Sequence, residues 1–212
     1  MSIVVYGLRL SPFVHRVKIA ARAKGVYDQI DFQMRPEGDA YLEITPLGRV
    51  PAMVADGKLI VESLSICWYI DAKFDGPRLA PEEAEDLAHV SMLVRLMELY
   101  AGAGLGKLFQ LGPAGDPQAL SDAFAELNQG LGYLERFIGE GEFAHGDSFT
   151  IADAVLAPTM FFVPAICGMV GRTPFEGAPK CAAYLARISE HPAVAPSFAE
   201  MTAALQERMA AG

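Results

Sequence analysis

Two junctions in the sequence place a serine where a strand pattern changes into a helix pattern. Ser11 follows an apolar run over residues 3–6, and Ser63, with Glu62 before it, follows a second such run. A helix N-terminus presents unpaired backbone N–H groups and the positive end of the helix dipole, which favour an anion. A serine hydroxyl adds a further donor, and a glutamate can pair with a cation. Each junction is therefore a candidate site for a small charged ligand.

The same residues also have an interpretation that needs no ligand. Serine is preferred at the N-cap of a helix, because its oxygen accepts hydrogen bonds from the first-turn N–H groups. Glu62 taken alone is typical of a solvated surface charge. For Ser11 the two roles compete for one oxygen, although a hydroxyl can accept from the helix while it donates to a ligand.

A third candidate is the dipeptide Val50-Pro51 at the start of a short strand pattern. The apolar runs at residues 52–54 and 59–61 flank Asp-Gly, which predicts a β-hairpin. Pro51 has no N–H and so weakens the ladder. It is either the first strand residue, where the missing donor costs nothing, or part of a cis bond that turns the Val50 backbone toward a ligand.

The strands and helices that must position these candidate residues are predicted to form a β-α-β unit followed by a β-β-α unit. Ser11 as N-cap, Pro12 after it and Gly25 past the end delimit the first helix. A second strand is expected over residues 29–34, followed by an irregular stretch up to residue 48. A right-handed crossover makes the first two strands parallel, and the hairpin adds antiparallel strands at one side.

This α/β domain is expected to span residues 1–76. Residues 77–83 contain two prolines and are expected to form a linker. Residues 84–212 lack strand patterns and carry apolar residues at helical spacing, so this domain is expected to be all-α. Within it, Thr150 as N-cap with Asp153 three residues later predicts a capping box.

The composition narrows the classes of function. The chain of 212 residues is 52% hydrophobic with a net charge of −9, which is globular and argues against non-specific binding to nucleic acid or anionic membrane. We expect no membrane span of about 18 apolar residues and no secretory signal. The histidines are scattered, and Cys67, Cys167 and Cys181 are an odd number without zinc spacing. A reducing, cytoplasmic compartment and no metal site are predicted.

Four stretches occur in an order and spacing that are similar to one known family: LRLSPFVHRV (8–17), ITPLGRVPAMV (44–54), VESLSICWYI (61–70) and SFTIADAVLAP (148–158). Together they resemble the soluble glutathione S-transferases, and the resemblance covers essentially the whole chain. It implies an N-terminal thioredoxin-like domain that binds glutathione and an all-helical domain that contributes the electrophile pocket. It also implies a cis-proline at Pro51, a homodimer, and a cytoplasmic role in detoxification.

For the binding site, the resemblance implies that glutathione is the co-substrate. Glu62 would pair with the γ-glutamyl ammonium of glutathione, and Ser63 would donate to the adjacent carboxylate. The Val50 backbone, freed by a cis bond to Pro51, would pair with the cysteinyl backbone of the ligand like a short added strand.

The resemblance implies a serine-type branch in which Ser11 is the catalytic residue and its hydroxyl stabilises the glutathione thiolate. Tyr6, within the first strand, is the alternative donor. Arg35 is a candidate partner for the glycine carboxylate of glutathione, and Arg49 has a similar status, although either is also typical of a solvated arginine. The candidate electrophile pocket is Phe13, Met97, Tyr100 and Leu105, and core packing explains Met97 equally well.

The predicted function is conjugation of the glutathione thiolate to small hydrophobic electrophiles. The alternatives are a glutathione-dependent peroxidase, dehalogenase or isomerase on the same fold, or a non-catalytic interaction or regulatory member. The isomerase branch carries a serine-rich run with a cysteine at the first helix, and the cysteine-based branches need a thiol in place of Ser11, so both are disfavoured. Ser11, Val50, Glu62 and Ser63 together favour an enzyme. His15 stands where relatives often carry Arg or Lys, without a physical account from the sequence.

Overall fold

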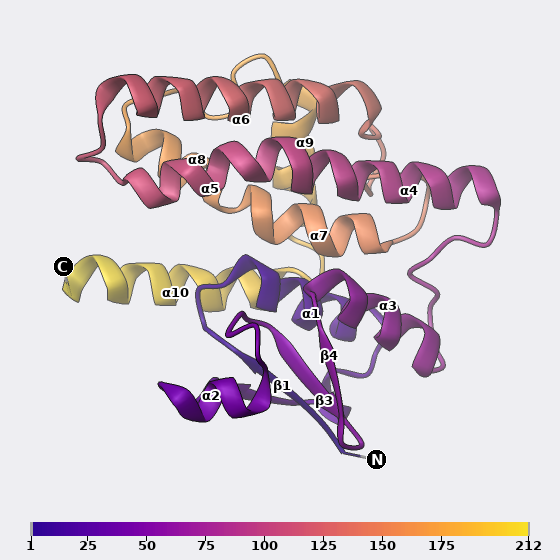
Figure 1. Cartoon of the computed structure of the whole chain (residues 1–212). Helices are drawn as coiled ribbons and strands as arrows, with labels where there is room; N and C mark the ends of the chain where they lie inside the picture. The colour runs from indigo at the N-terminus through magenta and orange to yellow at the C-terminus, as the bar shows by residue number, and fades with distance from the viewer. Residues whose placement is uncertain (1, 212) are drawn as a thin grey trace. The chain divides into compact units, whose positions relative to one another are not determined.

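The computed structural model describes residues 2–211, which form two compact units by their internal contacts (Figure 1). The first unit contains the residues up to Ala80 together with those from His191 onward. The second unit is Pro81–Glu190. The boundary between them falls inside the stretch that the sequence marks as a linker.

The first unit is built on a four-stranded mixed sheet with the strand order β2-β1-β3-β4. Strands β1 and β2 are parallel, as the β-α-β pattern predicts, and the β1–β3 and β3–β4 pairs are antiparallel. The hairpin turn is Asp56-Gly57 with φ values of 48° and 79°, the sign that a type I′ turn needs at both positions. The strands are Ile3–Gly7 (β1), Asp31–Met34 (β2), Ala52–Ala55 (β3) and Lys58–Val61 (β4).

Helices α1 and α3 of this unit pack against each other beside the sheet (Figure 1). Ser11 is the N-cap of α1 and Pro12 its first residue, as predicted, and Gly25 has a φ of 77° just past its end. Residues 35–48 are not irregular throughout, because a short helix, α2, forms among them; six residues are too few to show a helical period. The bounds are Pro12–Ala23 (α1), Asp39–Ile44 (α2) and Ser63–Lys73 (α3), with a 3-10 turn at Tyr27–Gln29.

The last helix, α10 (Ala195–Ala211), also belongs to the first unit and packs along α1. The prediction from the sequence assigns residues 84–212 to one helical domain. In the structure, α10 instead belongs to the same compact unit as the sheet. Glu200 of α10 accepts hydrogen bonds from Lys18 and from Arg22 of α1, the latter at 2.9 Å. These partners lie 182 and 178 residues apart, so no local pattern in the sequence signals the contact.

Asp71 on α3 secures the end of the first unit. Its carboxylate accepts hydrogen bonds from the Lys24 ammonium (2.8 Å) and from the backbone N–H groups of Leu79 (2.9 Å) and Ala80 (3.0 Å). The Lys24 and Asp71 side chains are only 2% and 8% exposed. A buried ion pair is tolerated when further hydrogen bonds satisfy the carboxylate, and here they hold the outgoing chain against the unit.

The regular elements described in the second unit are all helical, as predicted. Helices α4 and α5 run on through a π-helical turn at Met97–Ala101, and α6 packs closely against them. Gly104 and Gly130 permit this approach, because a Cβ there would lie 2.4 Å and 2.1 Å, respectively, from a backbone nitrogen of the facing helix. The helices are Ala84–Leu96 (α4), Gly102–Leu111 (α5), Pro117–Phe137 (α6), Ile151–Met160 (α7), Phe162–Met169 (α8) and Pro179–Ile188 (α9).

Helix α7 begins with the predicted capping box. One carboxylate oxygen of Asp153 accepts from the backbone N–H (2.8 Å) and the hydroxyl (3.1 Å) of Thr150. The other accepts from the backbone N–H of Ala144 (2.8 Å) and the hydroxyl of Tyr184 on α9 (3.0 Å). Burial raises the pKa of Asp153, and these four donors act in the opposite direction. The carboxylate thus ties the loop before α7 to α9.

One stretch, Ile151–Met169, is long and apolar enough by composition to cross a membrane, contrary to the expectation from the sequence. It consists of α7 and α8, and 78% of it is buried within the protein. Its apolar side chains are therefore already covered, as in the core helix of a globular unit.

Candidate functional site

A cavity of about 230 Å³ in the first unit lies where the chain enters β3 and where it leaves β4 for α3. The Val50–Pro51 bond is cis, as predicted. The cavity is lined by Phe13, Leu47, Arg49, Val50, Pro51, Val61, Glu62 and Ser63. The structure therefore brings together the four residues that the resemblance assigns to the γ-glutamyl and cysteinyl parts of glutathione.

Glu62 has an uncommon backbone conformation at the start of α3. Its φ of 67° lies in the left-handed region, which costs a non-glycine residue about 1–3 kcal/mol and is concentrated at functional sites. The Glu62 side chain is exposed and does not cap α3. The first-turn N–H groups of α3 are thus left without a side-chain cap, next to a carboxylate on the cavity wall.

Ser63 is buried, and its hydroxyl oxygen accepts a hydrogen bond from Arg16 of α1, with 3.4 Å from Nη1 to Oγ. Arg16 is 2% exposed, and its guanidinium carbon lies 4.6 Å from the centre of the Phe13 ring. Sequence reasoning missed Arg16, because nothing in the α1 pattern shows that α3 brings a serine beside it. The available signal was a charged residue between the apolar positions Val14 and Val17.

Ser11 is half-buried at the start of α1, and its hydroxyl oxygen accepts from the backbone N–H of Val14 at 3.4 Å. This bond is long for an N–H···O contact, so the cap engages the hydroxyl weakly. Because the hydroxyl takes part in it through its oxygen, its hydrogen can still donate to another group. Ser11 does not line the cavity itself, whereas Phe13, two residues later, does. Tyr6, the alternative donor, is a β1 residue opposite Ala52, and its ring packs edge-on to another tyrosine ring.

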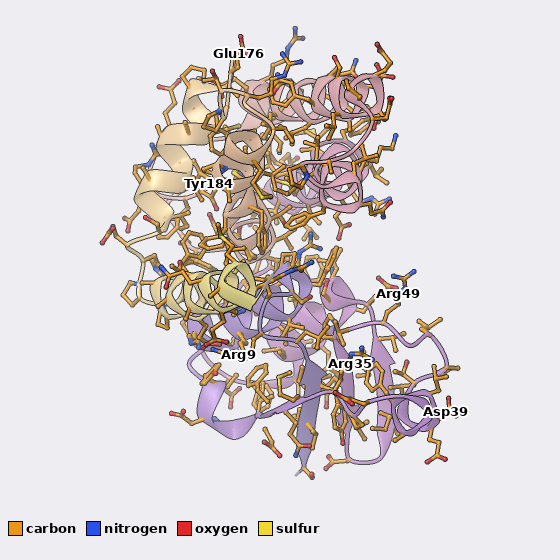
Figure 2. All side chains as sticks on the ribbon, turned by 90° about the vertical axis from the view of Figure 1, so that its left-hand side faces the viewer. Arg9, Arg35, Asp39, Arg49, Glu176 and Tyr184 are labelled. Carbon is orange, nitrogen blue, oxygen red and sulfur yellow. The ribbon has the colours of Figure 1, made fainter. Side chains whose placement is uncertain are left out.

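The two candidate arginines lie at separate places in the unit (Figure 2). Arg49 is exposed and lines the cavity. Arg35 is not among the lining residues, and its guanidinium carbon lies 5.6 Å from the centre of the Tyr41 ring. Buried Tyr41 donates its hydroxyl to the backbone carbonyl of Arg49 at 2.7 Å. Arg35 therefore supports the loop before β3 through Tyr41, and Arg49 is the better-placed cation.

The candidate electrophile residues are spread over both units. Phe13 is 48% exposed on the wall of the cavity in the first unit. In the second unit, Met97 and Leu105 are buried, which agrees with the core interpretation of Met97. Tyr100 is 45% exposed and packs edge-on to Tyr133. Of these residues, Phe13 and Tyr100 present accessible aromatic surface.

The protein's own thiols are poor candidates for a nucleophile. Cys67, Cys167 and Cys181 are buried and form no disulfide with one another. Burial raises the pKa of the Cys167 and Cys181 thiols, which reduces the reactive thiolate at neutral pH. Among residues 2–211, no group of three or more His, Cys, Asp or Glu side chains is placed to hold a metal ion.

His15 holds the loop that leads into Ser11. Its ring is fully buried on α1, and Nε2 lies 2.8 Å from the backbone carbonyl of Arg9, so this nitrogen carries the proton and donates. The Arg9 side chain forms a two-bond ion pair with Glu207 of α10, at 2.6 and 3.1 Å. Burial lowers the pKa of His15 to about 4. The structure thus accounts for a histidine that the sequence left unexplained, as a neutral donor.

His15 is expected to make stability fall in mild acid. Its folded-state pKa of about 4 lies below the ordinary 6.5, so unfolding takes up a proton once the pH is below 6.5. The stability that depends on neutral His15 is fully present above pH 6.5 and decreases as the pH falls toward 4. At pH 5 the free energy of unfolding is lower by about 2 kcal/mol for this reason. His15→Gln keeps an N–H donor for the Arg9 carbonyl but has no group that titrates. Between pH 8 and pH 5, we therefore expect its free energy of unfolding to fall by about 2 kcal/mol less than that of the wild type.

Urea unfolding at the two pH values measures the difference. His191→Gln is the matched control, because His191 lies in the same unit but is not fully buried. Equal acid losses in the wild type and His15→Gln would show that His15 does not resist protonation in the folded state.

The sheet, its flanking helices and the cis-proline at the cavity define a thioredoxin-like domain, and the second unit adds a helical domain. Family models confirm this class of two-domain protein. The model described as "Glutathione S-transferase, N-terminal domain" matches residues 10–73, and "Glutathione S-transferase, C-terminal domain" matches residues 117–187. The chain belongs to the soluble glutathione S-transferase family.

Individual relatives agree with this assignment. A probable glutathione S-transferase of Solanum tuberosum is 31% identical over 156 residues, covering 73% of this chain and 70% of that protein. A maleylacetoacetate isomerase of Mus musculus is 27% identical over 166 residues, covering 73% and 75%. Rice GST1, solved in complex with glutathione, superposes with a TM-score of 0.80 and 23% identity over 92% of this chain and 91% of that chain, which shows the shared fold.

Proposed function

We propose that the protein is a glutathione transferase that activates the glutathione thiol with Ser11 and joins it to small hydrophobic electrophiles. The observation that carries this proposal is the convergence of Val50, Pro51, Glu62 and Ser63 on one cavity. These residues come from two separate stretches of the chain, and a structural explanation of each alone does not account for their meeting.

In the proposed binding mode, glutathione lies along the cavity as an added strand. The γ-glutamyl carboxylate accepts from Ser63 and from the N–H groups at the start of α3, and the ammonium pairs with Glu62. The cysteinyl backbone pairs with the backbone of Val50. We assign the glycine carboxylate to Arg49 in preference to Arg35, since Arg49 lines the cavity.

The role proposed for Ser11 is to stabilise a thiolate. A thiol with an ordinary pKa near 8.5 is only about 3% ionised at pH 7. Lowering that pKa to about 6.5 ionises about three quarters of it and requires about 2.7 kcal/mol of preferential stabilisation. One hydrogen bond to a charged group supplies about 1.5–3 kcal/mol, and the helix α1 dipole adds to it.

A panel of electrophiles assayed with glutathione tests the reaction class. Peroxidase and dehalogenase activities share the activated thiol and differ in the electrophile, whereas a non-catalytic member turns over no substrate. The similarity to a maleylacetoacetate isomerase extends over most of the chain, so maleylacetoacetate belongs in the panel. Conjugation of an aryl halide with none of the other activities is the expected result.

Glutathione binding is the direct test of the site. Calorimetry should show saturable binding to the wild type, and Glu62→Ala should weaken it by about 1–3 kcal/mol through loss of a charged hydrogen bond. The control is Glu43→Ala, which changes an exposed glutamate of α2 that does not line the cavity; this variant should bind as the wild type does. A wild type that gives no heat up to millimolar glutathione would refute the proposal.

We also propose that the protein works as a cytoplasmic homodimer, as the family resemblance implies. Apolar side chains remain exposed on both units, among them Leu42 and Leu99, each 51% exposed, but single exposed apolar side chains are ordinary, so the proposal of a dimer rests on the resemblance. Light scattering at micromolar concentration should give a mass well above the 22.8 kDa of one chain. A mass equal to that of one chain would contradict the dimer.

A further inference from the structure

Tyr41 on α2 holds the peptide unit through which the chain reaches the cis bond at the cavity. Its side chain is 1% exposed, and its hydroxyl donates a hydrogen bond of 2.7 Å to the backbone carbonyl of Arg49. Burial raises the pKa of this hydroxyl, with the Arg35 charge acting in the opposite direction, so the phenol is a neutral donor at pH 7. A buried phenol needs a hydrogen-bond partner, and here the partner is the carbonyl of a cavity-lining residue.

The carbonyl of Arg49 and the N–H of Val50 belong to the same peptide unit. This peptide is trans, since the cis bond lies one residue later, at Val50–Pro51. In a planar trans peptide the C=O and the N–H point in opposite directions. By holding the carbonyl, Tyr41 therefore turns the Val50 N–H away from the phenol. Val50 lines the cavity, and its backbone is what the proposed binding mode pairs with the cysteinyl part of glutathione.

The segment between Tyr41 and Arg49 is also closed by backbone hydrogen bonds. The N–H of Thr45 donates to the Tyr41 carbonyl at 3.0 Å, and the N–H of Gly48 donates to the Thr45 carbonyl at 3.2 Å. The Tyr41 ring packs edge-on to the ring of Tyr6 on β1, with 6.5 Å between the ring centres. Tyr41 thus links the peptide after Arg49 to both α2 and β1, although Tyr41 itself does not line the cavity.

We propose that Tyr41 is a positioning residue that directs the Val50 N–H toward the cysteinyl carbonyl of bound glutathione. It acts through the Arg49 carbonyl and does not touch the ligand. The inference rests on the proposed function, because it needs glutathione paired with the Val50 backbone in this cavity. Without the phenolic hydroxyl the peptide is freer to rotate, and ordering it on binding then reduces the affinity.

The experiment compares, by calorimetry, the binding of glutathione with that of its analogue in which an ester replaces the amide between cysteine and glycine. An ester carbonyl is the weaker hydrogen-bond acceptor, so the wild type should bind glutathione about 2- to 12-fold more tightly. Tyr41→Phe, which removes only the hydroxyl, should weaken glutathione binding by a similar factor and analogue binding less, so that the preference falls. The ester also lacks the glycine N–H, but this difference is the same for both proteins.

Amide hydrogen exchange followed by NMR reports on the Val50 N–H itself. Glutathione should slow the exchange of this amide by about tenfold in the wild type, and by less in Tyr41→Phe. The wild-type measurement decides the question even if Tyr41→Phe does not fold. If glutathione slows exchange at the start of α3 but not at Val50, the inference is overturned.

Tyr27→Phe is the matched control. Tyr27 is a tyrosine of the first unit whose ring stacks on Phe32, and it does not line the cavity, so this variant should keep both affinities. Equal weakening of both ligands in Tyr41→Phe, or weakening of neither, would leave Tyr41 as a packing residue and overturn the inference. A wild type that binds neither ligand refutes the proposed function itself. A wild type that binds glutathione with a ratio indifferent to the Tyr41 hydroxyl refutes the role of Tyr41 alone.

Discussion

Replacing Ser11 by alanine is expected to raise the pKa of the thiol of bound glutathione by about 1 to 2 units. Turnover near pH 7 should fall by about 3-fold to about 25-fold, because the ionised fraction of the thiol falls from about three quarters to between about a quarter and about 3%. Affinity for glutathione should change less, since the removed hydrogen bond favours the thiolate over the thiol. The ultraviolet absorbance of the thiolate, titrated against pH in the complex, measures the shift directly.

Ser11 is also the N-cap of α1, so the loss of activity must be separated from loss of the cap. Alanine at an N-cap costs about 1 kcal/mol of stability, whereas glycine costs only a few tenths. Ser11→Gly should therefore lose as much activity as Ser11→Ala while it stays close to wild-type stability. Ser11→Cys should not restore conjugation, because a thiol is a weak hydrogen-bond donor. With glutathione disulfide it can instead form a mixed disulfide by thiol–disulfide exchange, which releases one molecule of reduced glutathione.

A folded Ser11→Ala variant with wild-type turnover and thiol pKa would reduce Ser11 to a helix cap. The donor would then be Tyr6 or a backbone N–H at the start of α1. Tyr6→Phe in the same assay distinguishes these two, since it removes the phenolic hydroxyl and leaves the backbone unchanged.

Replacing Asp153 by alanine is expected to destabilise the protein by about 3 to 5 kcal/mol. The side chain is fully buried and accepts four hydrogen bonds, from Ala144, from Tyr184 and twice from Thr150. Its removal leaves buried donors without acceptors and opens a cavity between the loop before α7 and α9. Urea unfolding at pH 7 measures the loss.

Asp153→Asn tests whether the acceptor pattern is responsible. The asparagine fits the same space but presents an NH₂ group where the aspartate accepts from N–H and O–H donors, so it should recover only a small part of the stability. Asp122→Ala on α6 is the control, because this aspartate is exposed and accepts a hydrogen bond from Gln118 one helical turn away. A loss for Asp153→Ala no larger than for Asp122→Ala would contradict the structural role of the buried carboxylate.

The sequence predicted those parts of the fold that depend on neighbours along the chain. The start of α1 at Ser11-Pro12, the hairpin at Asp56-Gly57 and the capping box of Thr150 and Asp153 are each set by a few adjacent residues. The cis bond before Pro51 was different, because the local pattern left it open and only the family resemblance decided it correctly.

The features that the sequence did not reveal are contacts between distant segments. Arg16 reaches Ser63 only after α1 and α3 have packed together. Tyr41 holds the carbonyl of Arg49 from a helix too short to be recognised. For the candidate site, the sequence could name residues that line the cavity, such as Val50 and Glu62. It could not name the side chains that contact and support them, because those contacts depend on tertiary packing rather than on spacing.

The grouping of α10 with the sheet has a consequence for how the chain is made. The first unit is discontinuous, and the whole of the second unit is inserted between its two segments. During synthesis, the whole helical unit is translated before Glu200 and Glu207 exist to pair with Lys18, Arg22 and Arg9. A nascent chain or an expressed fragment that ends near residue 80 therefore carries the proposed ligand-binding residues on an incomplete unit. In such a fragment, Arg9, Lys18 and Arg22 lack the carboxylates of α10 with which they pair in the full chain.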